Sequence, residues 1–101
     1  MFVLDAVKYD FGKTISVEED KLTVGGAVFE RENIGYIVDI GRSKYVILTK
    51  SGKLICRVMN SYDNFDLLWR WLVRGGCHFV SGEESWENVR DLFGMRIRYK
   101  R

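Results

Sequence analysis

The spacing of apolar residues along this chain changes near residue 60. Before that point, short runs alternate apolar and polar residues, which is the period of a strand with one buried face. Residues 14–18 show this period most clearly, with Ile15 and Val17 on one side. Beyond residue 60, apolar residues recur every three or four positions, which is the period of an amphipathic helix. The sequence therefore predicts an α+β fold in which the strands come first.

Turn residues divide the first part of the chain into short strands. Gly25 and Gly26 can adopt positive φ at little cost, and Ser51 followed by Gly52 is typical of a tight hairpin. The chain has no proline, so no segment is excluded from central pairing for lack of a backbone donor. We predict antiparallel strands at residues 2–8, 14–18, 21–24, 27–30, 35–40, 44–49 and 54–58.

The next predicted element is a helix over residues 65–74, which Gly75 and Gly76 end. We expect its broad apolar face to pack on the inner face of the sheet. That face is formed by Phe65, Leu68, Trp69, Leu72 and Val73, and the first four are the residues expected to make the contact.

Two further apolar residues, Leu67 and Trp71, widen the apolar arc of this helix. A helix that lies on a sheet needs an apolar stripe of only ~100° or slightly more. A second element should therefore cover Leu67 and Trp71, and the C-terminal segment is the expected cover. The alternative is that both residues belong to an exposed interface, since tryptophan is common among residues that dominate binding energy.

The C-terminal segment, residues 77–101, has weaker patterns. Residues 77–80 favour a short extended piece, and a second helix is expected from Ser81 or Ser85 to Phe93. Apolar and basic residues then alternate from Met95 to Lys100, which indicates either a final strand with one basic face or a continuation of the helix. With 101 residues the chain is predicted to form one domain, with its core at residues 2–76 and the C-terminal segment as an extension.

Seven strands followed by a closing helix is the order of the pleckstrin-homology (PH) superfold, and four segments resemble bacterial PH-like domains. They are TISVEEDKLTV at 14–24, ENIGYIVD at 32–39, VILTKSGK at 46–53 and FDLLWRWL at 65–72. The resemblance covers about residues 13–74 and has no counterpart for the C-terminal segment. It implies a bent sheet or half-barrel that the helix plugs at one end. It also implies binding of proteins or lipid headgroups without catalysis.

Phosphoinositide-binding PH domains carry basic residues at set positions of their first hairpin. Lys8 and Lys13 match two of these positions, but Ile15 stands where the family has an arginine, and alternation sends Ile15 inward. The resemblance therefore does not extend to specific phosphoinositide binding. Peripheral contact with a membrane is a minor alternative.

Positive charge is concentrated at the C-terminal end. Residues 90–101 hold five Arg or Lys residues against one Asp, whereas the chain as a whole has a net charge of only +2. Such a cluster could contact nucleic acid, lipid headgroups or an acidic protein surface. A pI near 8.6 and the lack of a recognition motif argue against specific nucleic-acid binding. The candidate anion-binding residues are Arg96, Arg98, Lys100 and Arg101.

The residue types that carry catalysis or bind metal are sparse. His78 is the only histidine and follows Cys77 directly, so on a strand their side chains point to opposite faces and cannot form a nucleophile–base pair. Together with Cys56 they give three ligands without paired spacing, whereas structural zinc normally has four. We therefore predict no enzymatic activity, no small-molecule substrate, no metal and no cofactor.

The chain has no apolar run near the ~20 residues that cross a bilayer, and its first residues do not resemble a signal peptide. Two cysteines without a secretion signal favour free thiols in the cytoplasm. The sequence thus favours a non-catalytic module that mediates protein–protein interaction, with another protein or by self-association. The alternative is a weak binder of anionic surfaces, either lipid headgroups or nucleic acid, through the basic C-terminal residues.

Overall fold

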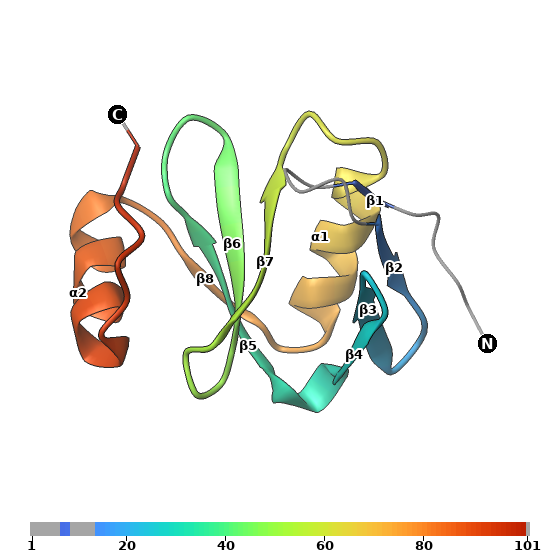
Figure 1. Ribbon diagram of the computed structural model, residues 1–101. Coiled ribbons are helices and arrows are strands. Elements are labelled where there is room, and N and C mark those ends of the chain that lie inside the picture. Colours follow the sequence, from blue (N-terminus) through green and yellow to red (C-terminus); the bar gives the residue numbers. More distant parts are fainter. Residues whose placement is uncertain (1–6, 9–13, 101) are drawn as a thin grey trace.

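Two four-stranded sheets form the framework of the protein (Figure 1). The structure, a computed structural model, describes residues 7–8 and 14–100. The first sheet is antiparallel and follows chain order, with β1 (Val7–Lys8), β2 (Thr14–Val17), β3 (Lys21–Val24) and β4 (Ala27–Glu30). The second sheet is mixed and has the order β7 (Leu54–Met59), β6 (Lys44–Thr49), β5 (Ile34–Asp39) and β8 (His78–Val80).

Every strand predicted before residue 60 is present within the described residues, and residues 2–6 of the first one lie outside them. The predicted single bent sheet, however, is divided in two. A short 3-10 turn, η1 (Arg31–Asn33), separates β4 from β5, so β5 starts a new sheet instead of pairing with β4. Among the described residues the strands form no closed barrel.

The helix predicted at residues 65–74 is confirmed as α1 (Phe65–Arg74), and a second helix, α2, spans Glu83–Phe93. Gly76 follows α1 with a φ of 80°, a conformation that glycine adopts without strain. Within the described part of the chain, neither helix has the length and apolar character needed to cross a membrane.

The second sheet lies between α1 and α2, and each of its faces borders a separate core (Figure 1). Its α1 face joins the first sheet and α1 in the first core, whose buried residues include Ile15, Leu22, Ile37, Ile47 and Leu68. Its α2 face forms the second core, whose buried residues are Val38, Ile40, Val46, Leu48 and Trp86. Neighbouring residues in β5 and β6 therefore point into different cores, which explains why both strands are almost continuously apolar.

The burial of α1 differs from the predicted one. Leu68, Trp71 and Leu72 are buried, whereas Phe65 and Trp69 are only partly buried. The buried arc is thus rotated toward Trp71, because the first sheet contacts that flank of the helix. The indole N–H of Trp71 donates a hydrogen bond of 2.6 Å to the carbonyl of Glu18, at the turn between β2 and β3.

The prediction that residues 77–99 cover Leu67 and Trp71 is wrong for α2 and residues 95–99, although Cys77 packs against the first core, to which both residues belong. After Gly76 the chain runs along the edge of β5 as β8, and this parallel pairing carries it to the other face of the second sheet. There Trp86 of α2 is 0% exposed, and its indole N–H donates to the carbonyl of Ile97 at 3.0 Å. The C-terminal segment does belong to the fold, but α2 and residues 95–99 cover the second core.

Residues 95–100 form neither the predicted strand nor a continuation of α2. The predicted alternation of side chains is nevertheless confirmed. Met95, Ile97 and Tyr99 pack against the second core, whereas Arg96 and Arg98 are exposed. The segment is held near its end by the backbone N–H of Lys100, which donates to the carbonyl of Ile40 at 2.5 Å.

Candidate interaction surface

Four aromatic residues from three elements form a continuous, partly exposed surface on the α1 side of the second sheet. Tyr45 comes from β6, Phe65 and Trp69 from α1, and Phe79 from β8. The ring centroids lie 5.3 Å apart for Tyr45 and Phe65, 5.6 Å for Tyr45 and Trp69, and 4.9 Å for Trp69 and Phe79. We call these four residues the aromatic surface.

The aromatic surface is only partly covered by the rest of the chain. Phe79 is 49% exposed, and the other three rings are half-buried. Val73 follows Trp69 by one helical turn and is 51% exposed, so it extends the apolar area along α1. Burial and the nearby Asp39 raise the pKa of Tyr45 above its ordinary value, so its hydroxyl stays neutral at physiological pH.

Charged residues lie beside the aromatic surface on α1. Around the helix, the next positions after Trp69 and Val73 are occupied by Asp66, Arg70 and Arg74, all of them exposed. Asp66 is in the first turn and Arg74 in the last. The first turn of α1 is therefore acidic and its last turn basic.

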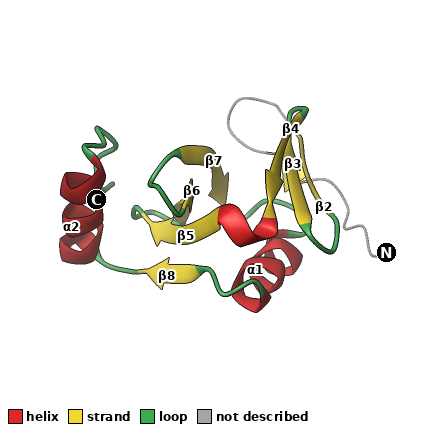
Figure 2. Cartoon of the chain, turned by 90° about the horizontal axis from the view of Figure 1, so that it is seen from below, coloured by secondary structure: helices red, strands yellow, loops and turns green. Residues whose placement is uncertain are grey.

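β8 places the exposed aromatic ring of Phe79 at the edge of the second sheet. This strand has only three residues and is the last in the strand order, with β5 on one side. Figure 2 shows α1 and β8 side by side along one edge of the molecule. β8 thus combines an open sheet edge with an adjacent aromatic surface.

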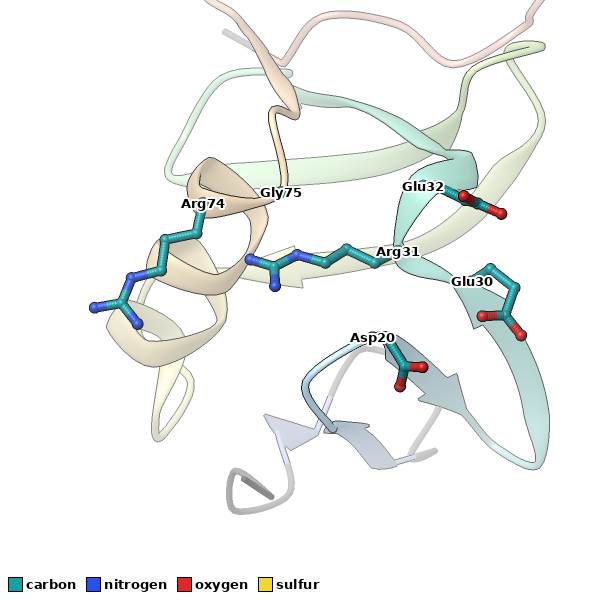
Figure 3. Close-up of a pocket in the computed structure, with 6 residues that line it drawn as sticks. All are labelled: Asp20, Glu30, Arg31, Glu32, Arg74 and Gly75. Carbon is teal, nitrogen blue, oxygen red and sulfur yellow. The ribbon is translucent and has the colours of Figure 1, made fainter. Parts of the chain in front are cut away.

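A hollow of about 550 Å³ lies between the first sheet and the end of α1 (Figure 3). Arg31 crosses its floor and is held by the protein itself. Its two terminal nitrogens donate to the carbonyl of Glu19 at 2.9 Å and to that of Trp71 at 2.8 Å, and its guanidinium lies 4.9 Å from the Trp71 ring centroid. A Cβ at position 75 would lie 2.7 Å from Arg31 Nε, so Gly75 makes room for this contact.

Arg31 therefore joins the first sheet to α1, and we interpret it as a structural clamp. The remaining charged groups of the hollow are three carboxylates and Arg74. Figure 3 shows that Arg74 extends away from the carboxylates of Asp20, Glu30 and Glu32. The hollow thus has no converging set of cations for an anion.

The structure describes three of the four residues predicted to bind anions. Arg96 and Arg98 are exposed on one side of the C-terminal segment, Lys100 is half-buried, and Arg101 lies outside the described residues. Anion binding by this group stays a prediction. The interface role predicted for Leu67 and Trp71 also stays a prediction, although Trp71 is only 6% exposed and Leu67 packs against the first core.

Cys77 and His78 lie on different sides of the second sheet, as the sequence predicts. Cys77 packs against the first core, whereas the His78 ring lies 6.0 Å from Tyr36 on the other side. Burial raises the pKa of Cys77 to about 11 and that of Cys56 to about 12, so both thiols are protonated at neutral pH. Over residues 7–8 and 14–100, no group of three His, Cys, Asp or Glu side chains is arranged to hold a metal ion.

Neither the models of known protein families, nor the curated proteins, nor the solved structures give a significant match to this chain. Sequence reasoning missed Phe79 and Tyr45 as surface residues. The signal for Phe79 was weak, because only its pairing with Ile37 across β5 and β8 places it next to Trp69.

Proposed function

We propose that this chain is a non-catalytic interaction module that binds another protein through the aromatic surface. The observation that carries this proposal is the continuous contact of Tyr45, Phe65, Trp69 and Phe79 at partial exposure. Large aromatic residues supply much of the binding energy at protein interfaces, because they bury a large area at a small cost in side-chain entropy. Leaving such a cluster half-exposed costs stability, and a partner that covers it would recover that cost.

The proposal includes a PH-like fold for residues 7–8 and 14–74. Three features support this assignment. The first sheet has four strands, the second begins with three antiparallel strands, and the helix that follows packs against both sheets. In a PH-like fold the two sheets would together form the half-barrel, and α1 would plug one end of it. β8 and α2 are additions to that plan. The unpaired thiols of Cys56 and Cys77 support a reducing compartment such as the cytoplasm.

A second candidate function is weak binding of anionic surfaces by the C-terminal segment. Arg96 and Arg98 favour it, because the inward packing of Met95, Ile97 and Tyr99 leaves both guanidinium groups exposed on one side. Two or three cations in a row support only weak, salt-sensitive binding. Protein binding through the aromatic surface therefore ranks first.

Selection of short peptides from a random display library tests the first candidate. Phe79→Ser removes an exposed ring from the aromatic surface, and Leu92→Ser removes an exposed apolar side chain (74% exposed) from α2 as the matched control. We expect the selected peptides to bind the wild type and Leu92→Ser alike, and to bind Phe79→Ser at least about 10-fold more weakly. Peptides that bind Phe79→Ser as well as the wild type would place the binding site elsewhere.

A further inference from the structure

The outer edge of β8 presents backbone groups that no strand of the sheet uses. The N–H of Ile40 donates to the carbonyl of Lys44 at 3.0 Å, in the direction of β6. Successive residues of a strand direct their backbone groups to alternate edges, so the N–H and C=O of Ile37 are directed toward β8. Ile37 lies opposite Phe79 in this parallel pair and therefore bonds to its two neighbours, His78 and Val80.

The N–H and C=O of Phe79 consequently face away from β5. A second observation agrees with this direction. Two residues earlier, the N–H of Cys77 donates to the carbonyl of Leu72 in α1 at 3.1 Å, and not to β5. Among the described residues, the backbone hydrogen bonds outside helices and sheets include none from Phe79. The edge thus presents one donor and one acceptor at the residue that carries the exposed ring.

A new strand paired with β8 would direct every second side chain to the face of the sheet that carries the aromatic surface. The Phe79 side chain points to the α1 side and contacts Trp69 edge-on, with an interplanar angle of 72°. A residue paired with Phe79 on an added strand would project to the same side, since directly paired residues share a face. It would therefore cover Phe79 and reach Trp69 and Val73.

The charged residues on the neighbouring surface of α1 indicate which kind of strand would bind there. Arg70 and Arg74 are exposed, and the ion pair found in the described part of the chain is a different one, Arg90 with Asp91 at 3.6 Å. Arg74 also extends away from the carboxylates of the hollow (Figure 3). Carboxylates on a partner would meet the unpaired guanidinium group of Arg70 beside the apolar contact, whereas Arg74 lines the hollow on the other flank of α1.

We infer that the partner binds as an added β-strand on the outer edge of β8, and that it is an extended, acidic segment of another protein. One large apolar residue of that segment covers Phe79 and Trp69, and an acidic residue next to it pairs with Arg70. This inference rests on the proposed function, because it names the kind of partner that the aromatic surface takes. Backbone pairing supplies affinity, and the apolar and acidic side chains supply specificity.

NMR titration of the ¹⁵N-labelled chain with a synthetic peptide tests this mode. The probe is acetylated and amidated Asp-Glu-Val-Phe-Val-Glu-Asp, which combines a strand-forming centre with four carboxylates. We expect the amide resonance of Phe79 and the indole resonance of Trp69 to shift together, and the Phe79 amide to become protected from hydrogen exchange. The same peptide with Gln for every acidic residue is the control for charge, and it should bind more weakly.

A series of peptides, each N-methylated at one backbone amide, separates strand addition from contact by side chains alone. Only an amide that faces β8 donates to Phe79, so methylation there should weaken binding about fivefold to tenfold. Methylation of the next amide, which points to solvent, should have a much smaller effect. Equal effects at neighbouring positions, with an unshifted Phe79 amide, would overturn strand addition but leave the proposed function intact.

The other outcomes are equally decisive. If neither the Phe79 amide nor the Trp69 indole responds to the peptide, both the inference and the proposed function fail. Shifts confined to Arg96 and Arg98 would assign the acidic peptide to the C-terminal segment and overturn both in favour of the anion-binding function. A Phe79 shift that appears on raising the protein concentration without peptide would identify a second copy as the occupant and overturn the inference.

Discussion

The two cores on either side of the second sheet differ in how they are closed. The first core is built from both sheets and α1, and it contains buried residues from β2, β3, β5, β6, β7 and α1. Among the described residues the second core has five buried residues: Val38, Val46 and Leu48 from the second sheet, Ile40 directly after β5, and Trp86 from α2. The difference shows that strands and one helix close the first core, whereas the second core depends on the C-terminal segment, which follows the other strands of the sheet in sequence.

Removal of the C-terminal segment is the strongest test of this difference. Truncation after Gly76 uncovers four residues that are at most 1% exposed, namely Val38, Ile40, Val46 and Leu48. Exposing a buried aliphatic side chain costs roughly 1.5–3 kcal/mol, and a domain of this size has a total stability of only about 5–15 kcal/mol. We expect the truncated chain to form oligomers or to lose most of its stability.

Size-exclusion chromatography and thermal denaturation measure this outcome. Truncation after Gly94 is the control, because it keeps Trp86 and removes no fully buried residue of the second core, only its partly buried neighbours Met95, Ile97 and Tyr99. It should give a smaller loss of stability. A chain ending at Gly76 that stays monomeric with an unchanged melting temperature would show that the second core contributes nothing to the fold.

A smaller effect is expected when a single contact in the first core is lost. Leu68 is 1% exposed and lies in α1 among the buried residues of that core. Leu68→Ala should lower the free energy of unfolding by about 2–5 kcal/mol, the range for a cavity that cannot collapse. Val73→Ala is the control on the same helix, because Val73 is half-exposed. A loss below about 0.5 kcal/mol for Leu68→Ala in urea denaturation would mean that this face of α1 is misassigned.

The clamp between the first sheet and α1 should contribute less than the apolar contacts. Arg31 donates from two separate nitrogens to two carbonyls, those of Glu19 and Trp71. Arg31→Lys keeps the charge but replaces the guanidinium fork with one ammonium group, which has a different geometry. We expect a loss of about 1–3 kcal/mol in urea denaturation, because the partly buried carbonyl of Trp71 and the exposed carbonyl of Glu19 lose a charged donor.

The matched control is Arg42→Lys, which makes the same substitution at an exposed residue. It should leave the stability within about 0.5 kcal/mol of the wild type. Equal stability of the two variants would show that the hydrogen bonds of Arg31 make no net contribution.

The comparison of the two cores also explains how far the sequence could predict the structure. The alternation of Ile15 and Val17 and the stop at Gly75 are local signals, and the strands and α1 were predicted from such signals. The cover of Trp71 was predicted wrongly, because it depends on Glu18 and Arg31, which are 53 and 40 residues away in sequence. Long-range pairing of this kind leaves no local pattern.

The candidate surface was harder to predict for the same reason. Trp69 was assigned to the core because helical spacing places it beside Leu72, yet α1 is rotated and Trp69 is half-buried. Phe79 lies beside Trp69 only because β8 pairs in parallel with β5. The near-continuous apolar character of β5 and β6 was the one available sign that the second sheet is covered on both faces.

The smallest expected effect on stability concerns the exposed side of the C-terminal segment. Arg96 and Arg98 are exposed, while their neighbours pack on the second core. Replacing both with glutamine should change the free energy of unfolding by no more than about 0.5 kcal/mol. If this segment binds polyanions, the same double variant should lose its retention on heparin, and the retention of the wild type should fall steeply with salt.

The control for this prediction is the double variant Lys50→Gln with Lys53→Gln, which removes two exposed charges from the hairpin between β6 and β7. Both double variants have the same formal net charge, so a difference between them reports the position of the charges and not their number. Loss of retention only in the Arg96 and Arg98 variant would establish a local anion site. An equal loss of heparin retention in both variants would show that retention depends only on the net charge of the chain. A wild-type chain that passes through heparin at low salt without delay would leave protein binding as the sole proposed function.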